Sequence, residues 1–327
     1  MKSNKNYNTR KTLNFIPIKA HIVRTTNHNG GLSETSVIKA IENLNEIYAD
    51  AFMKFYLFDE INYLDSDELS NFKKGNEQTL IGTNYVPNTI NVYFIEAIEN
   101  SFGESICGYV EEKNNIIIMK NSCAVNDSSL AHEMGHFFSL LHTHGPSNSR
   151  LTTELVDGSN CDTDGDGICD TPADPTLSNN TIDDSCNYSG NVKDSHGNFF
   201  KPDTRNIMSY SRKSCRNYFS EQQFSRIYGY YKTIEDSLKP DYHEIETENN
   251  DLISVKIYPN PVSNDKLFLK VSLENPSINY TITNFQGQTL SQGKTSNKEI
   301  NVNNLSPGSY LLVLDNGTSS VVRKFIK

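Results

Sequence analysis

The chain has 327 residues, of which 36% are hydrophobic and 21% are charged, and its formal net charge is −10 at pH 7. This length is sufficient for one large domain and one small domain. The negative charge argues against nucleic acid or an anionic membrane as a partner, because phosphate binding needs a basic surface. Apolar runs such as 115–119 and 310–314 have the length of strands, and none approaches the ~20 residues of a membrane span.

The first half of the chain alternates between strand and helix periodicities. Apolar side chains recur at every second position in Phe15–Arg24, and they take helical spacing after Ser33, a suitable N-cap. This pattern predicts a mixed, twisted sheet with two long helices, the second of which packs beneath the sheet. The predicted elements are a strand at Phe15–Arg24, a helix from Ser33, strands at Ala51–Phe58 and Thr89–Ile95, a hairpin of Ser105–Val110 and Asn115–Lys120, and a helix from about Asp127.

The composition changes after His144. Residues 145–206 are dominated by Gly, Asp, Asn, Ser and Pro, and a loop of this length is usually functional or held together by ligands and disulfides. A closing helix is predicted from Ser220, an acidic linker at 239–251, and a small all-β sandwich at 252–327. The predicted strands of the sandwich are Ser254–Tyr258, Lys266–Val271, Tyr280–Asn284, Tyr310–Leu314 and Val321–Ile326.

All six cysteines lie between Cys107 and Cys215, mostly in loops with little capacity to form a core. Disulfides stabilise such loops in exported proteins, so three bridges and an oxidising location are expected. Free thiols or a second zinc site are the alternative, although no C-x-x-C occurs. Cys107 and Cys123 flank the predicted hairpin and could pair. Three pairings stay open for the other four, Cys161, Cys169, Cys186 and Cys215.

The N-terminal residues do not resemble an export signal. Residues 1–14 form a tail rich in Lys and Asn that lacks the apolar segment of a secretory signal. An exported protein with this sequence would therefore carry its signal upstream of Met1, or would already have lost it.

Half of the histidines lie in residues 132–144, where His132-Glu133-x-x-His136 is followed by His142. Two His four residues apart project from one face of a helix and can bind the same zinc ion at ~2.0–2.1 Å. His142 can join them only if the helix ends near Ser139 and the chain turns back. Three ligands and an open fourth position are typical of catalytic zinc, and Glu133 can then act as the general base.

The motif has two other interpretations. An amphipathic core helix can carry two partly exposed His without binding a metal. A structural zinc site would need a fourth protein ligand such as His144, but the spacing favours His142. The catalytic zinc site is the interpretation that the sequence favours.

A second motif, Asn206-Ile207-Met208-Ser209-Tyr210, follows after more than sixty residues. Met is commonly a core filler. Together, however, the two motifs resemble those of the metzincin metallopeptidases, in which a Met-turn lies beneath the zinc. The similarity is closest to the pappalysin-like (ulilysin, cytophagalysin) family, whose D-T-P-A segment resembles Asp170-Thr171-Pro172-Ala173. It covers roughly Phe15–Leu238, the predicted α+β catalytic domain at 15–238.

This resemblance implies roles for individual residues. His132, His136 and His142 would be the zinc ligands, Glu133 the general base and Met208 the floor beneath the metal. Tyr210 would stabilise the oxyanion, its alternative being a packed aromatic side chain. Ser139 stands where the clan has a helix-ending Gly. A left-handed Ser costs ~1–2 kcal/mol, which is small beside zinc binding, so the turn is expected to form.

The segment 161–170 suggests a calcium site. Asp162, Asp164 and Asp166 follow the D-x-D-x-D-G pattern of EF-hand-like loops, although no Glu closes the loop. The pappalysin resemblance strengthens the calcium prediction and adds Asp170 and Thr171, whereas the alternative is a solvated turn. The same resemblance implies the interlaced disulfides Cys161–Cys186 and Cys169–Cys215, which would tie the calcium loop to the Met-turn.

The C-terminal region has its own resemblance. Residues 255–262 (VKIYPNPV), 305–310 (LSPGSY) and the terminal Lys324-Phe325-Ile326-Lys327 are similar to the C-terminal sorting domain of the type IX secretion system. Such a domain implies the type IX machinery as a partner and a secreted or outer-membrane location. A carbohydrate- or surface-binding sandwich is the alternative.

The sequence therefore predicts a secreted zinc endopeptidase that hydrolyses peptide bonds by Glu-assisted attack of zinc-bound water. The peptide or protein substrate is expected to pair as an extended strand near Ile106–Val110. Arg212, Lys213 and Arg216 follow the Met-turn and disfavour basic side chains in the primed pocket. The alternative function is a non-catalytic cell-surface binding protein with a vestigial metal site.

Overall fold

The computed structural model describes residues 14–82, 84–126, 128–240, 255–262, 264–271, 278–284, 288–295, 297–315 and 320–327. It divides the chain into two compact units, Met1–Asp241 and Tyr242–Lys327. The predicted tail at 1–14 and the predicted acidic linker at 239–251 lie almost entirely outside the described residues. The boundaries assigned to them from the sequence stay predictions.

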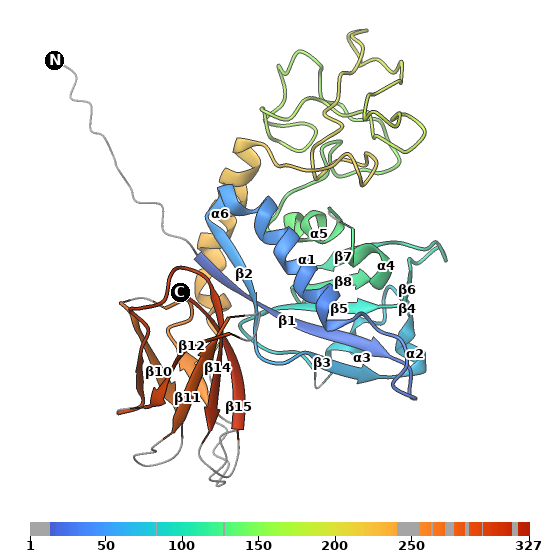
Figure 1. Cartoon of the computed structure of the whole chain (residues 1–327). Coiled ribbons are helices and arrows are strands. Elements are labelled where there is room, and N and C mark those ends of the chain that lie inside the picture. The colour runs from blue at the N-terminus through green and yellow to red at the C-terminus, as the bar shows by residue number, and fades with distance from the viewer. Residues whose placement is uncertain are drawn as a thin grey trace, which may run out of the picture. The chain divides into compact units, whose positions relative to one another are not determined.

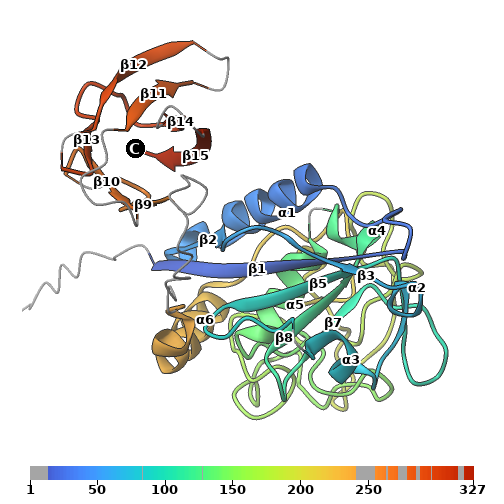
Figure 2. The same ribbon diagram turned by 90° about the horizontal axis from the view of Figure 1, so that it is seen from below.

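A six-stranded mixed sheet forms the centre of the first unit (Figure 1). Its strands follow the order β2-β1-β5-β8-β7, and β3 also pairs with β1. All the pairings are parallel except that of β7 with β8, which is the predicted antiparallel hairpin. The strands are β1 (Asn14–Arg24), β2 (Met53–Leu57), β3 (Asn62–Asp65), β5 (Ile90–Ile95), β7 (Gly108–Glu111) and β8 (Ile116–Lys120). Figure 2 shows β1, β5, β8 and β7 side by side in this order.

Both faces of this sheet are covered. The main core lies on one face, where alternate residues of β1, β5 and β8 pack against three helices. A second core on the opposite face contains Val23, Tyr93 and Ile118 together with residues of short elements. The three helices are α1 (Glu34–Ile47), α5 (Ser129–Phe137) and α6 (Glu221–Ile234). The short elements of the second core are α2 (Asp67–Ser70), β4 (Asn71–Lys73), α3 (Glu77–Ile81) and β6 (Ala97–Glu99), whereas α4 (Asn121–Ala124) and the 3-10 turns Ala49–Ala51 and Glu235–Leu238 contribute to the main core.

The predicted mixed sheet is confirmed, but only one of the two long helices is as expected. Helix α1 has 14 residues and starts at the predicted N-cap, since Ser33 accepts a hydrogen bond from Ser36 N. Helix α5 has only nine residues because the chain leaves the helix at Phe138. The segment between β2 and β5 had no predicted elements, and β3, α2, β4 and α3 lie there. These elements are too short to carry a clear periodicity.

Between α5 and α6 the chain contains no helix and no strand, as the composition of residues 145–206 predicted. Isolated bridges such as Ile182–Tyr188 and Lys193–Phe199 are its only ladder pairs. A small apolar cluster includes Leu177, Ile182 and Cys215. The folding of this segment therefore depends mainly on turns, side-chain hydrogen bonds and disulfides.

The disulfides correct one prediction. Cys107–Cys123 pairs as expected, but the other bridges are Cys161–Cys169 and Cys186–Cys215, not the interlaced pair that the resemblance implied. Cys161 and Cys169 are eight residues apart in the sequence. Closing so short a loop costs less chain entropy than pairing two distant cysteines.

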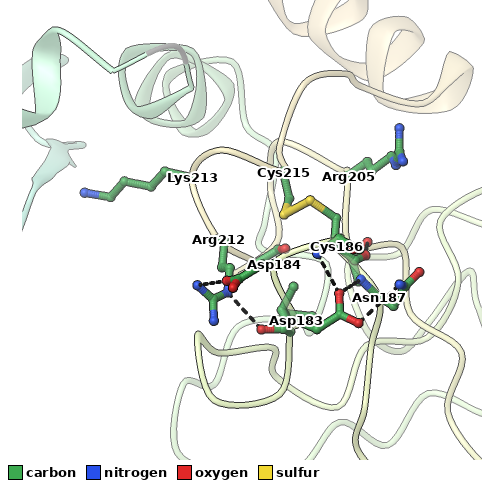
Figure 3. Close-up of a disulfide and its surroundings, with 12 residues drawn as sticks. Asp183, Asp184, Cys186, Asn187, Arg205, Arg212, Lys213 and Cys215 are labelled. Atoms are coloured by element: carbon green, nitrogen blue, oxygen red, sulfur yellow. Dashed lines mark hydrogen bonds and ion pairs between the residues drawn. A yellow bond between two sulfur atoms is a disulfide. The ribbon is translucent and has the colours of Figure 1, made fainter.

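Cys186 and Cys215 share the apolar cluster around Leu177, which brings their sulfurs together (Figure 3). This bridge connects the loop at Ile182–Tyr188 to the segment that follows the Met-turn. The acidic loop is instead tied to α6 by hydrogen bonds from Arg226 to Asp166 O and Gly167 O.

The second unit is built from antiparallel strands in two sheets, with the orders β13-β10-β9 and β12-β11-β14-β15. One apolar core contains residues of both sheets, including Leu267, Ile282 and Leu312, as in a β-sandwich. All five predicted strands are present, whereas β12 and β13 were missed. The strands are β9 (Lys256–Tyr258), β10 (Lys266–Lys270), β11 (Asn279–Thr283), β12 (Thr289–Lys294), β13 (Glu299–Asn301), β14 (Ser309–Asp315) and β15 (Ser320–Ile326).

Among the described residues of either unit, no helix combines the length and the apolar character that crossing a bilayer requires.

The start of α6 supplies a test of the first unit's stability. Ser220 forms a capping box with Gln223, and its hydroxyl also donates to Asp170 Oδ1. We expect Ser220→Ala to lower the free energy of unfolding by about 1–2 kcal/mol, because an N-cap and a charge-assisted hydrogen bond are lost together. Thermal unfolding followed by circular dichroism measures the change.

Ser225→Ala is the matched control, because the exposed Ser225 hydroxyl bonds only to Glu221 O within the same helix. Equal melting temperatures for the two variants would show that the capping box contributes nothing to stability.

Candidate metal centre and active-site cleft

Helix α5 carries the first two predicted ligands and Glu133, and its C-terminal end is formed by local contacts. Ser139 adopts a left-handed conformation with φ of 66°, as predicted for the position where the resembled family has Gly. His136 Nδ1 bonds to Leu140 O at 2.8 Å, and Leu140 N donates to Gly135 O. The chain therefore turns back directly after Ser139 and brings His142 beside the helix.

The three predicted ligand histidines converge. Ligand atoms of His132, His136 and His142 all lie within 4.8 Å of one another, and Nε2 of His136 is 3.0 Å from Nε2 of His142. Among the described residues, this is the only group of three or more His, Cys, Asp or Glu side chains placed closely enough to hold a metal ion. His144, the alternative fourth ligand, does not belong to this group.

The hydrogen bonds of the His132 and His136 rings leave the Nε2 atom of each ring free to bind a metal ion. His132 Nδ1 lies 2.7 Å from Ile207 O and His136 Nδ1 lies 2.8 Å from Leu140 O, so each Nδ1 donates to a carbonyl. The Nε2 atoms of both rings are then acceptors, which is the tautomer that a metal ligand needs.

Burial also favours neutral rings at this site. It lowers the pKa of His132 and His136 and brings the pKa of His142 down to about 2. Neutral imidazoles are the form that binds metal. Two ligand nitrogens of tetrahedral zinc lie roughly 3.3 Å apart, close to the 3.0 Å between His136 and His142. The donor set therefore fits zinc.

Glu133 lies next to the first ligand and has the properties of a general base. Its side chain is buried, and this burial raises its pKa to about 7, against the opposing influence of Arg216 and Lys74. A carboxylate with a pKa near neutrality can both accept and return a proton. Gly108 of the edge strand β7 lies beside it, since a Cβ at Gly108 would be 3.3 Å from Glu133 Cγ.

Met208 lies directly under helix α5. Its side chain is fully buried in the main core, and a Cβ at Gly135 would come within 2.5 Å of Met208 Sδ. The absence of a side chain at Gly135 thus permits the Met-turn to approach the helix. Thr143 N donates to Met208 O at 3.2 Å, which joins the returning chain after His142 to the same turn.

Tyr210 faces the histidines. Its ring centroid lies 4.4 Å from that of His142 and 6.4 Å from that of His132. Burial raises the pKa of its phenol, while a hydrogen bond with Asn148 opposes the shift. Asn148 Oδ1 also lies 2.9 Å from His144 Nε2. Asn148 was not among the predicted site residues, because it stands alone in a loop without a motif.

An open cleft of about 1390 Å³ contains these residues. Edge strand β7 contributes Gly108, Tyr109 and Val110 to one wall, and the segment after the Met-turn contributes residues 210–214 and Arg216 to another. Among the described strands β7 pairs only with β8, so it lies at the edge of the sheet, and its residues line the cleft. The predicted substrate-binding segment, Ile106–Val110, therefore lines the cleft throughout.

The predicted calcium ligands do not come together. The side chain of the exposed Asp162 forms no hydrogen bond or ion pair with a described residue, and Asp164 accepts hydrogen bonds from Thr153 and Thr163. Asp170 instead caps α6 through Ser220 and Gln222 N. Only Asp166 and Thr171 are adjacent, joined by hydrogen bonds of 3.0 Å. The D-x-D-x-D-G segment thus does not adopt the EF-hand arrangement.

Asp166 instead has neighbours that the sequence analysis missed. Glu154 and Asp174 are buried, like Asp166, and the charges of Asp166 and Asp174 help to raise the pKa of Glu154. Glu154 Oε2 has no hydrogen-bond partner among the described residues. Neither residue belongs to a recognisable motif with Asp166, because they are twelve and eight positions away in opposite directions.

Comparisons with known proteins agree with this geometry. The peptidase M43 family model, described as Pregnancy-associated plasma protein-A, matches residues 110–231. A second model, described as Secretion system C-terminal sorting domain, matches residues 256–327. A search of curated proteins found no match.

Two solved structures show distant similarity. A zinc-dependent peptidase from Methanocorpusculum labreanum is 11% identical over 64% of this chain and 99% of its own, with a TM-score of 0.31. PorZ, a surface component of the type-IX secretion system of Porphyromonas gingivalis, is 20% identical over 25% of this chain and 12% of its own, with a TM-score of 0.21. Scores this low carry no argument here.

The three converging histidines and Glu133 lie inside the segment that matches the peptidase family, and the β-sandwich coincides with the sorting-domain match. The match at residues 110–231 therefore supports a metallopeptidase, and the match at residues 256–327 to the C-terminal sorting domain indicates secretion through the type IX system to the cell surface or the extracellular space.

Proposed function

We propose that this protein is a zinc endopeptidase of the metzincin type that cleaves peptide bonds outside the cell. The single observation that carries the proposal is the convergence of three neutral imidazoles beside a buried Glu133 whose pKa is about 7. His132, His136 and His142 would hold the zinc ion. When bound, zinc would polarise the scissile carbonyl and lower the pKa of water.

The residues of the chain would perform the proton transfers. Glu133 takes a proton from the attacking water and then delivers it to the leaving amine, a role that suits a carboxylate with a pKa near 7. Tyr210 keeps its proton at neutral pH because burial raises its pKa, so its hydroxyl can donate to the developing oxyanion. Asn148 would hold the phenol in position.

The substrate would bind as an added strand along β7. This strand has a free edge that lines the cleft, and Gly108 leaves room for a peptide backbone close to Glu133. Main-chain pairing of this kind supplies affinity with little dependence on sequence, and side-chain pockets add specificity.

A non-catalytic binding protein with a vestigial metal site is the competing function. Such a protein would not need a general base between its ligands or a tyrosine held beside them. Casein hydrolysis with and without a chelator separates the two functions, because only the endopeptidase clears casein and loses this activity when zinc is removed.

Substitution of Glu133 tests the proton-transfer role. We expect Glu133→Ala to bind zinc as the wild type does, because Glu133 is not a ligand, and to lose at least ~100-fold in kcat/KM, the usual contribution of a general base. Metal analysis and initial rates on a fluorogenic peptide measure both properties. Glu42→Ala, at an exposed position of α1, is the control. Wild-type rates in Glu133→Ala would contradict the mechanism.

Removal of one hydroxyl tests Tyr210. Tyr210→Phe should lower kcat by roughly 10- to 100-fold with little change in KM, since oxyanion donors act mainly in the transition state. Tyr228→Phe, on the exposed side of α6, is the matched control. An unchanged kcat in Tyr210→Phe would reduce Tyr210 to a packing residue.

We also propose that calcium binds between Asp166 and Glu154, in place of Asp162, Asp164 and Asp170. The two buried carboxylates repel each other and one Glu154 oxygen has no hydrogen-bond partner among the described residues, an arrangement that is unfavourable without a cation. Oxygen-rich acidic sites of this kind suit calcium. Thr171, which bonds to Asp166, would stay in contact with the site.

The pH dependence of stability tests the calcium proposal. Burial raises the pKa of Glu154 to about 8 and that of Asp166 to about 7, above their usual values near 4. Without calcium, the folded state therefore binds more protons than the unfolded state between about pH 4 and 8, and stability falls as the pH rises through this window. Calcium should raise Tm more at pH 8 than at pH 5.

Glu154→Gln should abolish most of the calcium effect, and Asp162→Asn, at an exposed position of the same loop, should preserve it. Differential scanning calorimetry of the zinc-loaded protein measures these shifts. A Tm that does not respond to calcium at pH 8 would eliminate the site.

A further inference from the structure

Arg216 is a buried cation in the wall of the active-site cleft. Only 8% of its surface is exposed, and the exposed part lines the cleft beside His132. Its Nη1 donates to Ser209 O at 3.1 Å and lies 3.2 Å from His132 Nδ1. Since His132 Nδ1 carries the proton that it donates to Ile207 O, it cannot also accept from Arg216. Among the described residues, the Ser209 carbonyl oxygen is thus the one acceptor of a hydrogen bond from the Arg216 guanidinium.

The opposite edge of this guanidinium has no partner. Neither Nε nor Nη2 of Arg216 makes a hydrogen bond to any described residue, and no described carboxylate forms an ion pair with it. Arg24 uses this same edge elsewhere in the protein, where Nε and Nη2 bind both oxygens of Asp65 at 2.8 and 3.1 Å. A buried charge without such a partner is destabilising. Glu133 interacts with Arg216 through its charge but forms no ion pair with it, so the Nε and Nη2 edge is available for a carboxylate of another molecule.

Lys213 adds a second cation to the same wall. It is exposed, lines the cleft, and contacts the sulfurs of Cys107 and Cys123 without forming an ion pair with any described carboxylate. Arg212 differs, because it is already bound to Asp184 and to Ile182 O (Figure 3). Two unpaired cations thus lie within four positions of a chain whose net charge is −10. The positive charge is a local feature of the cleft.

We propose that Arg216 and Lys213 form the pocket for an acidic side chain of the substrate, so that the enzyme selects peptides with Asp or Glu next to the scissile bond. The guanidinium would bind the carboxylate through its Nε and Nη2 edge, and the Lys213 ammonium would add a second, more exposed contact. Because Arg216 lies beside His132, a carboxylate bound to it would lie close to the reacting bond. This assignment of the pocket rests on the proposed endopeptidase function.

Binding to the full-length, zinc-loaded Glu133→Ala variant tests the pocket without requiring turnover. Fluorescently labelled peptides would carry Glu, Gln or Lys in turn at each position of a neutral host sequence, with an amidated C-terminus. We expect one position at which Glu binds at least about tenfold more tightly than Gln, and Lys more weakly than both. Host peptides with a free C-terminus show whether a terminal carboxylate, rather than a side chain, occupies the pocket. Preference only for the free terminus would overturn the proposal.

Three variants in the same background assign the effect to residues. Arg216→Gln should reduce the Glu preference to less than about threefold, and Lys213→Glu, at an exposed position, should reduce it and improve the binding of Lys peptides. Arg205→Glu introduces the same charge change in the same subdomain, but Arg205 does not line the cleft and points away from Lys213 in Figure 3. It should keep the preference. Loss of the preference in Arg205→Glu as well would contradict a pocket made by Arg216 and Lys213.

Cleavage by the wild type separates this inference from the proposed function. Mass spectrometry of the same peptides locates the cut bond, which should lie next to the preferred Glu. Chelator-sensitive cleavage without any preference for Glu in binding or turnover would overturn the pocket and leave the endopeptidase intact. Glu-selective binding that needs Arg216, without cleavage of any peptide or of casein, would support the pocket and overturn the endopeptidase.

Discussion

The hydrogen bond between His132 Nδ1 and Ile207 O is the interaction on which the site depends. It joins helix α5 to the Met-turn, two segments separated by 75 residues in the sequence, and it fixes the tautomer that presents Nε2 to a metal. The same turn accepts a hydrogen bond from Thr143, next to the third histidine, and packs Met208 against Gly135. The Met-turn therefore contacts both α5, which carries His132 and His136, and the segment that carries His142.

Rigid elements surround this contact. Asn206 at the start of the Met-turn bonds to the buried side chain of Gln223, which is itself part of the capping box of α6. Helix α6, the Met-turn and helix α5 thus form one hydrogen-bonded unit on the face of the sheet. Because the turn continues into residues 211–216, the segment that supports the metal site also forms one wall of the cleft. The same stretch of chain therefore holds the histidine cluster in place and, in the function proposed above, would also contact the substrate.

The loop segment between α5 and α6 is stabilised in a different way from the sheet and its helices. Residues 145–206 bury little apolar surface, so their folding relies on local disulfides, on carboxylates that accept several backbone hydrogen bonds, and on ties to α6. Asp183 and Asp194 each close a tight turn in this way. Such a segment can retain buried carboxylates such as Glu154 and Asp166 because burial raises their pKa values and favours the neutral, protonated form.

The sequence by itself determined the local features of this protein. The spacing of His132, His136 and His142 predicted the cluster of three histidines, Ser33 and Ser220 marked the starts of α1 and α6, and period-two patterns located β1, β5 and the β7–β8 hairpin. These features depend on contacts between residues close together in the chain. Only the tertiary structure decided the pairing of Cys161 with Cys169, the partners of Asp166, and the unpaired edge of Arg216. They depend on how distant loops meet, and residues without periodicity carry no local signal of where they will lie.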